Sequence, residues 1–96
     1  MDKHVYLSNL YDYYGELLTT KQQHYFEDYY CNDLSLKEIS DNQGISRNAV
    51  FKQLQNIANK LLMYEEKLNL YAKDQKLRKI IDQIKDKRIK EQLEEL

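Results

Sequence analysis

The sequence predicts an all-α fold: a helix-turn-helix bundle with a long fourth helix and a helical C-terminal arm. The 96 residues include no proline and only two glycines, Gly15 and Gly44, whereas strand-rich folds need many tight turns built from such residues. Apolar residues also recur at spacings of three and four, the period of a helix with one buried face. We therefore expect a helix-turn-helix domain over residues 1–72 and a helical tail or arm over residues 73–96.

The front half of the chain predicts two amphipathic helices rich in tyrosine. The first covers about residues 3–18 and the second about residues 21–31, with Thr20 as N-cap and Gln23 completing a capping box. Cys31, the single cysteine, is expected to be a small core residue. The residues expected to face inward are Leu7, Leu10, Tyr14 and Leu17, widened by Tyr6, Tyr11, Tyr13 and Leu18, and then Tyr25, Phe26, Tyr29 and Tyr30.

The middle of the chain has the spacing of a helix-turn-helix unit. Ser35 and Glu38 predict a capping box for a short helix that ends at Gly44, and Ser46 caps the helix that follows. Only Gln43 is polar at a position where an apolar residue is often found. The small residues expected at the helix contact are Ser40 and Ala49, and the shared apolar seam consists of Ile39, Ile45, Val50 and Leu54.

The helix after Ser46 is predicted to be long, because its apolar stripe continues by steps of four and three. The stripe consists of Val50, Leu54, Ile57, Leu61, Tyr64, Leu68 and Tyr71. Its near end is interpreted as core. Its far end (Tyr64, Leu68 and Tyr71) either packs on the front half or forms a dimer seam with a second chain. We expect a break at Lys73–Asp74, and a bend or two short helices where the later stripe slips near residues 86–88.

The second helix of such a unit directs its N-terminal side chains toward base edges in the major groove of DNA. The outward positions are Ser46, Arg47, Asn48, Phe51, Lys52 and Gln55, with Lys37 on the preceding helix. Arg47 suits a bidentate contact to guanine, Asn48 or Gln55 a contact to adenine, and the lysines suit phosphate. Phe51 is unusual on a reading face, and it equally fits a thymine methyl, a protein contact or the core.

Charge is balanced overall at −1 but is unevenly distributed. Residues 1–33 have two lysines against six acidic side chains, a net of −4, whereas residues 34–61 carry +2 and residues 62–96 carry +1. A dedicated DNA-binding domain usually has a stronger basic footprint, so a helical hairpin that reads no DNA is the competing interpretation.

The sequence contains no pattern typical of an enzyme. It has no glycine-rich phosphate loop, no metal-ligand cluster and no nucleophile–base pair, and His4 and His24 stand apart. We therefore predict that the protein is not an enzyme and needs no cofactor. The start of the chain lacks the features of a signal peptide, and no apolar run approaches membrane-spanning length. We expect a cytoplasmic protein without membrane insertion.

The segment from Leu36 to Arg47 resembles the promoter-reading C-terminal region of bacterial sigma factors. Over about residues 5–72 the chain is similar to the YlxM family of small bacterial proteins. The matching pieces are Leu17-Leu18-Thr19-Thr20-Lys21-Gln22-Gln23, Tyr29-Tyr30, Asp33-Leu34-Ser35-Leu36-Lys37-Glu38-Ile39, Ser46-Arg47-Asn48-Ala49-Val50 and Tyr64-Glu65-Glu66-Lys67-Leu68. The resemblance implies a sigma-like helix-turn-helix and no catalytic residues. It also implies a link to the signal recognition particle, because family members are typically encoded beside that particle's GTPase.

Two functional hypotheses follow from these patterns. The first is a DNA-binding regulatory protein that acts on duplex DNA in the signal recognition particle (protein-targeting) pathway. The alternative is an adaptor that binds the particle's GTPase or its RNA without binding DNA. In either case the far stripe and the apolar tail predict a homodimer.

Overall fold

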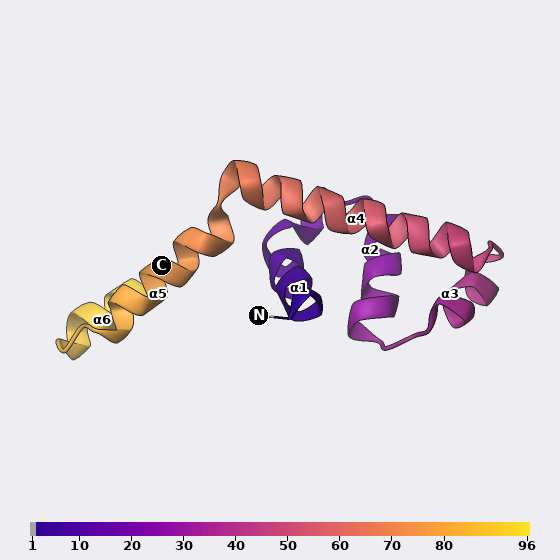
Figure 1. Ribbon diagram of the computed structural model, residues 1–96. Coiled ribbons are helices and arrows are strands. Elements are labelled where there is room, and N and C mark those ends of the chain that lie inside the picture. The colour runs from indigo at the N-terminus through magenta and orange to yellow at the C-terminus, as the bar shows by residue number, and fades with distance from the viewer. Residues whose placement is uncertain (1) are drawn as a thin grey trace.

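The computed structural model describes residues 2–96, and over that range the chain forms helices and no strand. The helices are α1 (Lys3–Tyr14), α2 (Thr20–Phe26), α3 (Leu36–Gln43), α4 (Arg47–Leu68), α5 (Leu70–Asp82) and α6 (Lys87–Glu94). A 3-10 turn (Gly15–Leu17) follows α1, and a π-helical turn (Glu27–Cys31) continues α2. The all-α prediction is confirmed. The molecule is elongated, with extents of 55 × 25 × 24 Å (Figure 1).

Helix α4 is the central helix, against which α1, α2 and α3 all pack. Helix α3 packs near its start, α2 near its middle and α1 toward its end (Figure 1). The buried face of α4 consists of Val50, Leu54, Ile57 and Leu61, as the sequence predicts. These side chains share one core with Leu7, Leu10, Tyr14, Leu18, Tyr25, Phe26 and Ile39. Burying each of these apolar side chains contributes about 1.5–3 kcal/mol, so the single stripe on α4 holds the front half together.

The end of α1 differs from the prediction in two respects. The α-helix ends at Tyr14, and the tighter 3-10 turn that follows rotates Leu17 outward to 55% exposure and turns Leu18 into the core at 5%. The predicted N-cap at Thr20 is also wrong. The capping box uses Thr19 and Gln22: the Thr19 hydroxyl accepts a bond of 3.1 Å from the Gln22 N–H, and the Gln22 side chain accepts one of 3.0 Å from the Thr19 N–H.

The side chain of Gln23, which was expected to complete the capping box, has another partner. It donates to the Gly15 carbonyl at 2.8 Å and so ties α2 to the preceding turn. Cys31, predicted to lie in the core, is exposed. It closes the π-helical turn, in which the Asn32 N–H donates to the Glu27 carbonyl at 2.8 Å. The wider turn shifts the helical register, and this shift carries Cys31 away from the core.

The predicted break at Lys73–Asp74 lies four residues too late. Helix α4 ends at Leu68, Asn69 adopts the left-handed conformation with φ 59°, and α5 runs without interruption through Lys73 and Asp74. Asparagine adopts this conformation more readily than most residues. The second expected irregularity is confirmed, because α5 ends at Asp82 and Asp86 caps α6. The boundary expected between residues 72 and 73 therefore falls inside α5.

A buried carboxylate joins the core to the arm, which consists of α5 and α6. Glu65 is 7% exposed and accepts three hydrogen bonds: from the Tyr14 hydroxyl at 2.5 Å and from the N–H groups of Tyr71 and Ala72 at 3.0 Å each. The Tyr14 hydroxyl in turn accepts from the Leu70 N–H at 3.0 Å. Burial, and then the bond to Glu65, raises the pKa of Tyr14. Negative charge at a helix N-terminus is stabilising, so Glu65 caps α5 and fixes its direction.

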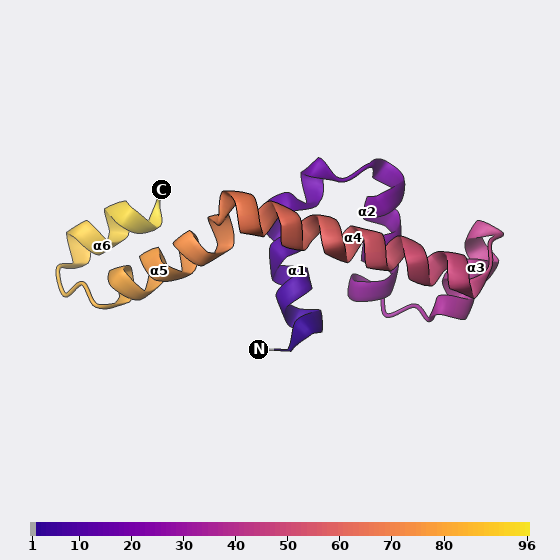
Figure 2. The same ribbon diagram turned by 45° about the horizontal axis from the view of Figure 1, so that its top comes forward.

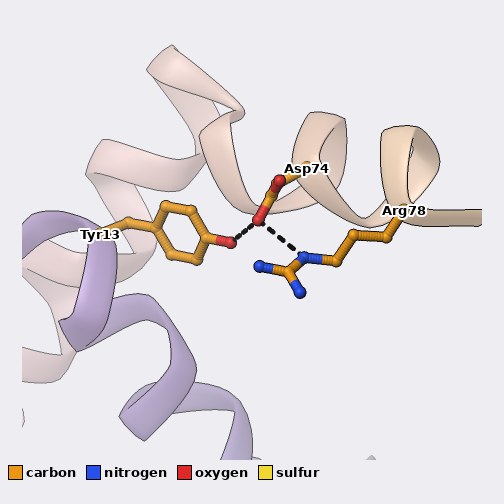
Figure 3. Close-up of polar contacts among 3 residues, drawn as sticks. All are labelled: Tyr13, Asp74 and Arg78. Atoms are coloured by element: carbon orange, nitrogen blue, oxygen red, sulfur yellow. Dashed lines mark hydrogen bonds and ion pairs between the residues drawn. The ribbon is translucent and has the colours of Figure 1, made fainter. Parts of the chain in front are cut away.

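A second polar contact, outside the core, joins α1 to α5. The Tyr13 hydroxyl of α1 donates to the Asp74 carboxylate of α5, which also pairs with Arg78 at 3.2 Å (Figure 3). The bond to Asp74 is the main cause that raises the pKa of Tyr13, to about 12, and the bonds from Tyr13 and Arg78 lower the pKa of Asp74. The first turns of α5 are therefore anchored to α1, while α6 folds back beside α5 far from the core (Figure 2).

Replacing Glu65 by Gln should destabilise the fold. The amide keeps the volume of the side chain but loses the charge and presents an NH2 group to donors, so we expect a loss of about 2 kcal/mol in the free energy of unfolding. Urea denaturation measures this loss. Glu66→Gln is the matched control, since Glu66 is exposed, and it should change stability by less than about 0.5 kcal/mol. Equal losses in the two variants would contradict the capping role of Glu65.

Candidate nucleic-acid interface

The turn between α3 and α4 has the geometry that the sequence predicts. Ser35 and Glu38 form a capping box with two bonds of 3.1 Å, and α3 ends at Gly44 in the left-handed conformation with φ 67°. The Ile45 N–H then donates to the Ser40 carbonyl at 3.2 Å, and the Ser46 hydroxyl accepts from the Ala49 N–H at 3.1 Å. Local hydrogen bonds therefore hold the start of α3, the turn at Gly44 and the start of α4, and they fix the geometry of the helix-turn-helix unit.

Small and apolar side chains close the contact between α3 and α4. Ile39 and Val50 are fully buried, and Ser40 is 7% exposed. The Ser40 hydroxyl donates to the Lys37 carbonyl at 2.8 Å, which satisfies it inside its own helix. Ile45 and Ala49 are half-buried beside them, and Gln43, the polar exception in the pattern, is exposed. The off-pattern residue therefore does not interrupt the seam.

All the side chains predicted to form the reading face are exposed. They are Ser46, Arg47, Asn48, Phe51, Lys52 and Gln55 on α4, and Lys37 on α3. On α4 they alternate with the buried Val50 and Leu54, so the core fixes which sector of the helix meets solvent. The first N–H groups of α4, at the Ser46 end, lack carbonyl partners within the helix and so favour an anion. The face can present one guanidinium, two ammonium groups and two amides to a ligand.

Phe51 borders a groove that the sequence does not predict. Its side chain is 50% exposed, and the groove beside it has a volume of about 260 Å³. Lys3 of α1, the Tyr29–Tyr30 pair, Leu36 of α3 and Gln55 line the groove with Phe51. The ring of His4 lies against that of Tyr30 at a tilt of 52°, with 4.4 Å between ring centroids, so the start of α1 covers one end of the tyrosine pair.

The three residues predicted as a dimer seam do not share one helix face. Tyr64 packs near Tyr14 in the core, with 5.9 Å between ring centroids. Tyr71 lies beyond the break at Asn69 and meets Tyr6 and Tyr13 edge-on at 5.6 and 5.9 Å. Leu68 is 46% exposed. A contact of these three residues with a second chain stays a prediction, but two of them already pack within their own chain.

No helix within residues 2–96 has the length and apolar character needed to cross a membrane. Three or more histidine, cysteine, aspartate or glutamate side chains do not gather as metal ligands anywhere in the described part of the chain.

Replacing Gly44 by Ala should destabilise the unit through the backbone alone. A Cβ at this position would meet no atom within 4 Å, but φ is +67°, a conformation that costs an L-residue about 1–2 kcal/mol. Thermal or urea denaturation measures the loss. Gly44→Asn is the control and should lose less, because asparagine tolerates the left-handed region. A Gly44→Ala variant as stable as the unchanged chain would contradict this account of the turn.

The comparisons with known proteins all indicate the same family. The family model described as "Putative helix-turn-helix protein, YlxM / p13 like" matches residues 1–96. A UPF0122 protein of Caldanaerobacter subterraneus is 47% identical over 85 residues, which cover 88% of this chain and 73% of the relative. A relative from Oceanobacillus iheyensis is 40% identical over 100 residues, covering all of this chain and 95% of its own length. One from Fusobacterium nucleatum is 38% identical over 96 residues, covering 100% and 93%.

Proposed function

The chain belongs to the YlxM / p13-like helix-turn-helix family, and on that premise we propose that it is a DNA-binding regulatory protein of the protein-targeting pathway. The observation that supports DNA binding is the exposed sector of α4 directly after the Gly44 turn. Arg47, Asn48 and Gln55 project from this sector at helical spacing, and a reading helix uses such positions to reach base edges. The pathway rests on the family resemblance, because members are typically encoded beside the GTPase of the signal recognition particle.

The bonding roles on this face differ from residue to residue. The guanidinium of Arg47 has the fork geometry for a guanine edge, and the amides of Asn48 and Gln55 match adenine. Lys52 and Lys37 contribute phosphate contacts that position the helix without selecting sequence. With only two basic side chains on the α4 face, affinity depends strongly on salt and on how closely the helix approaches the groove.

Arg47→Ala should weaken binding to a selected duplex by about 1–3 kcal/mol and relax the sequence preference at one base pair. Duplexes selected from a random pool at low salt provide the ligand, and fluorescence anisotropy measures the affinity. Lys67→Ala is the charge-matched control, because Lys67 is exposed at the opposite end of α4. DNA binding is ruled out as the function if the unchanged chain binds no duplex at low salt, where phosphate contacts are strongest.

A second candidate function is supported by Phe51 and the groove beside it. A half-exposed aromatic ring next to an apolar groove is typical of a protein contact more than of a base-reading surface. On this alternative the chain is an adaptor that binds the GTPase of the signal recognition particle, or the RNA bound to it.

Phe51→Ala distinguishes the adaptor from the DNA reader. If the chain is the adaptor, Phe51→Ala should abolish co-purification with the purified GTPase–RNA complex, whereas Arg47→Ala should leave it nearly unchanged. A pull-down of each variant with the GTPase alone, the RNA alone and the complex assigns the partner. An unchanged chain that co-purifies with none of them, and that does not alter GTP hydrolysis, would exclude the adaptor.

A further inference from the structure

The arm formed by α5 and α6 lacks a core of its own. Over residues 70–96 only Ile81 is buried, at 6% exposure. Ile84 and Leu93 are half-buried, and five other large apolar side chains of the hairpin are exposed: Leu70 at 45%, Leu77 at 38%, Ile80 at 58%, Ile89 at 47% and Leu96 at 94%. A helical hairpin that buries one side chain gains too little from packing to offset the entropy of ordering its residues. The arm therefore needs a further surface against which to pack.

The large apolar side chains of each helix in the hairpin follow a stripe. In α5 and the turn after it, Leu70, Leu77, Ile80 and Ile84 follow at steps of seven, three and four, which is a heptad-like stripe. In α6, Ile89, Leu93 and Leu96 follow at steps of four and three. Between the two helices lies an open groove of about 560 Å³. Its lining is half apolar, with Leu77, Ile81, Leu93 and Leu96, and half charged, with Asp74, Arg78, Asp82 and Glu94. Leu77 of the first stripe and Leu93 and Leu96 of the second line this groove, so the two stripes meet there. We call the two stripes together the apolar face.

The charges at the edges of this face are complementary to each other. Lys73 and Lys76 are exposed on α5. Lys73 lies within the stripe, three residues after Leu70 and four before Leu77, and Lys76 flanks it. Glu94 and Glu95 are exposed in the last turn of α6. Because α6 runs back along α5, these two pairs lie at the same end of the hairpin: Asp74 and Glu94 line the same groove. Suppose that a second hairpin packs face to face on the first, with α5 of each copy against α6 of the other. The lysines of each copy then lie beside the glutamates of the other at both edges of the contact.

We propose that two copies of the chain associate face to face through their arms, forming a four-helix bundle in which α5 of each copy lies against α6 of the other. The apolar face supplies the buried surface of the bundle, and the lysine and glutamate pairs fix which helices meet. The contact is isologous, so it closes as a dimer and leaves no arm uncovered. It leaves the α3–α4 units of both copies free and does not depend on whether those units bind DNA or protein.

Ile80→Asp tests the apolar face without removing a core residue, because Ile80 is the more exposed of the two isoleucines that follow each other in α5. Light scattering on the full chain at micromolar concentration should give twice the 11.7 kDa chain mass, and the variant should give 11.7 kDa. Val5→Asp is the matched control, a β-branched residue of 49% exposure on α1, and it should stay dimeric. Circular dichroism checks that all variants keep their helical content.

Charge exchange tests the pairing of α5 with α6. The double variant Lys73→Glu/Lys76→Glu and the double variant Glu94→Lys/Glu95→Lys should each be monomeric, because like charges then face each other at both edges. Mixed in equal amounts they should form a heterodimer of wild-type affinity, since every facing pair is again of opposite sign.

Four results overturn the proposal. A monomeric unchanged chain at micromolar concentration rules out the dimer, and an Ile80→Asp variant that stays dimeric rules out the apolar face of the arm as its interface. Failure of the two charge variants to associate on mixing excludes the pairing of α5 with α6. If the arm of a monomeric chain becomes protected from hydrogen exchange only when duplex DNA is added, the apolar face belongs to the nucleic-acid complex and not to a second copy.

Discussion

The front half of the molecule depends on one apolar stripe, formed by Val50, Leu54, Ile57 and Leu61 on α4. Helices α1, α2 and α3 all pack against this stripe, so α4 fixes the position of each (Figure 1). The residues proposed to contact a partner stand on the first turns of the same helix. Their placement is therefore as rigid as the core itself, which is the condition under which a few side chains can select a ligand by geometry. A change inside the stripe would disturb the reading face and the three helices together.

Helix α4 also fixes the orientation of the arm. Its 22 residues span about 33 Å, with the reading face at one end and Glu65 near the other. Because Glu65 accepts from Tyr14 of α1 and from the first N–H groups of α5, the start of the arm is tied to both α1 and α4. The bond from Tyr13 to Asp74 strengthens this junction from outside the core. The arm thus leaves the domain in a defined direction although it has almost no core of its own.

Local signals made most of the helix-turn-helix predictable. The capping box at Ser35 and the positive φ at Gly44 each depend on residues within a few positions, and the exposed sector of α4 follows from helical periodicity. The failures lie where tertiary contacts decide. Thr19 and Thr20 are each followed three residues later by a glutamine, so the sequence alone supports either as N-cap. The break at Asn69 depends on Glu65 capping the next helix, and the groove beside Phe51 exists only because α1 folds back near α3.

The low positive charge of the α4 face is the main argument against DNA binding. The proposed dimer weakens that argument. A single face with Arg47 and Lys52 releases few counterions, so one copy alone would bind duplex DNA weakly. Two faces joined through the arms bind with an effective concentration set by the connection between them, and the connection here is helical and anchored at Glu65 instead of flexible. Paired helix-turn-helix units read half-sites about one helical turn apart. Weak charge on each face is then compatible with selective binding, because selectivity comes from the spacing of two modest contacts as well as from the strength of each.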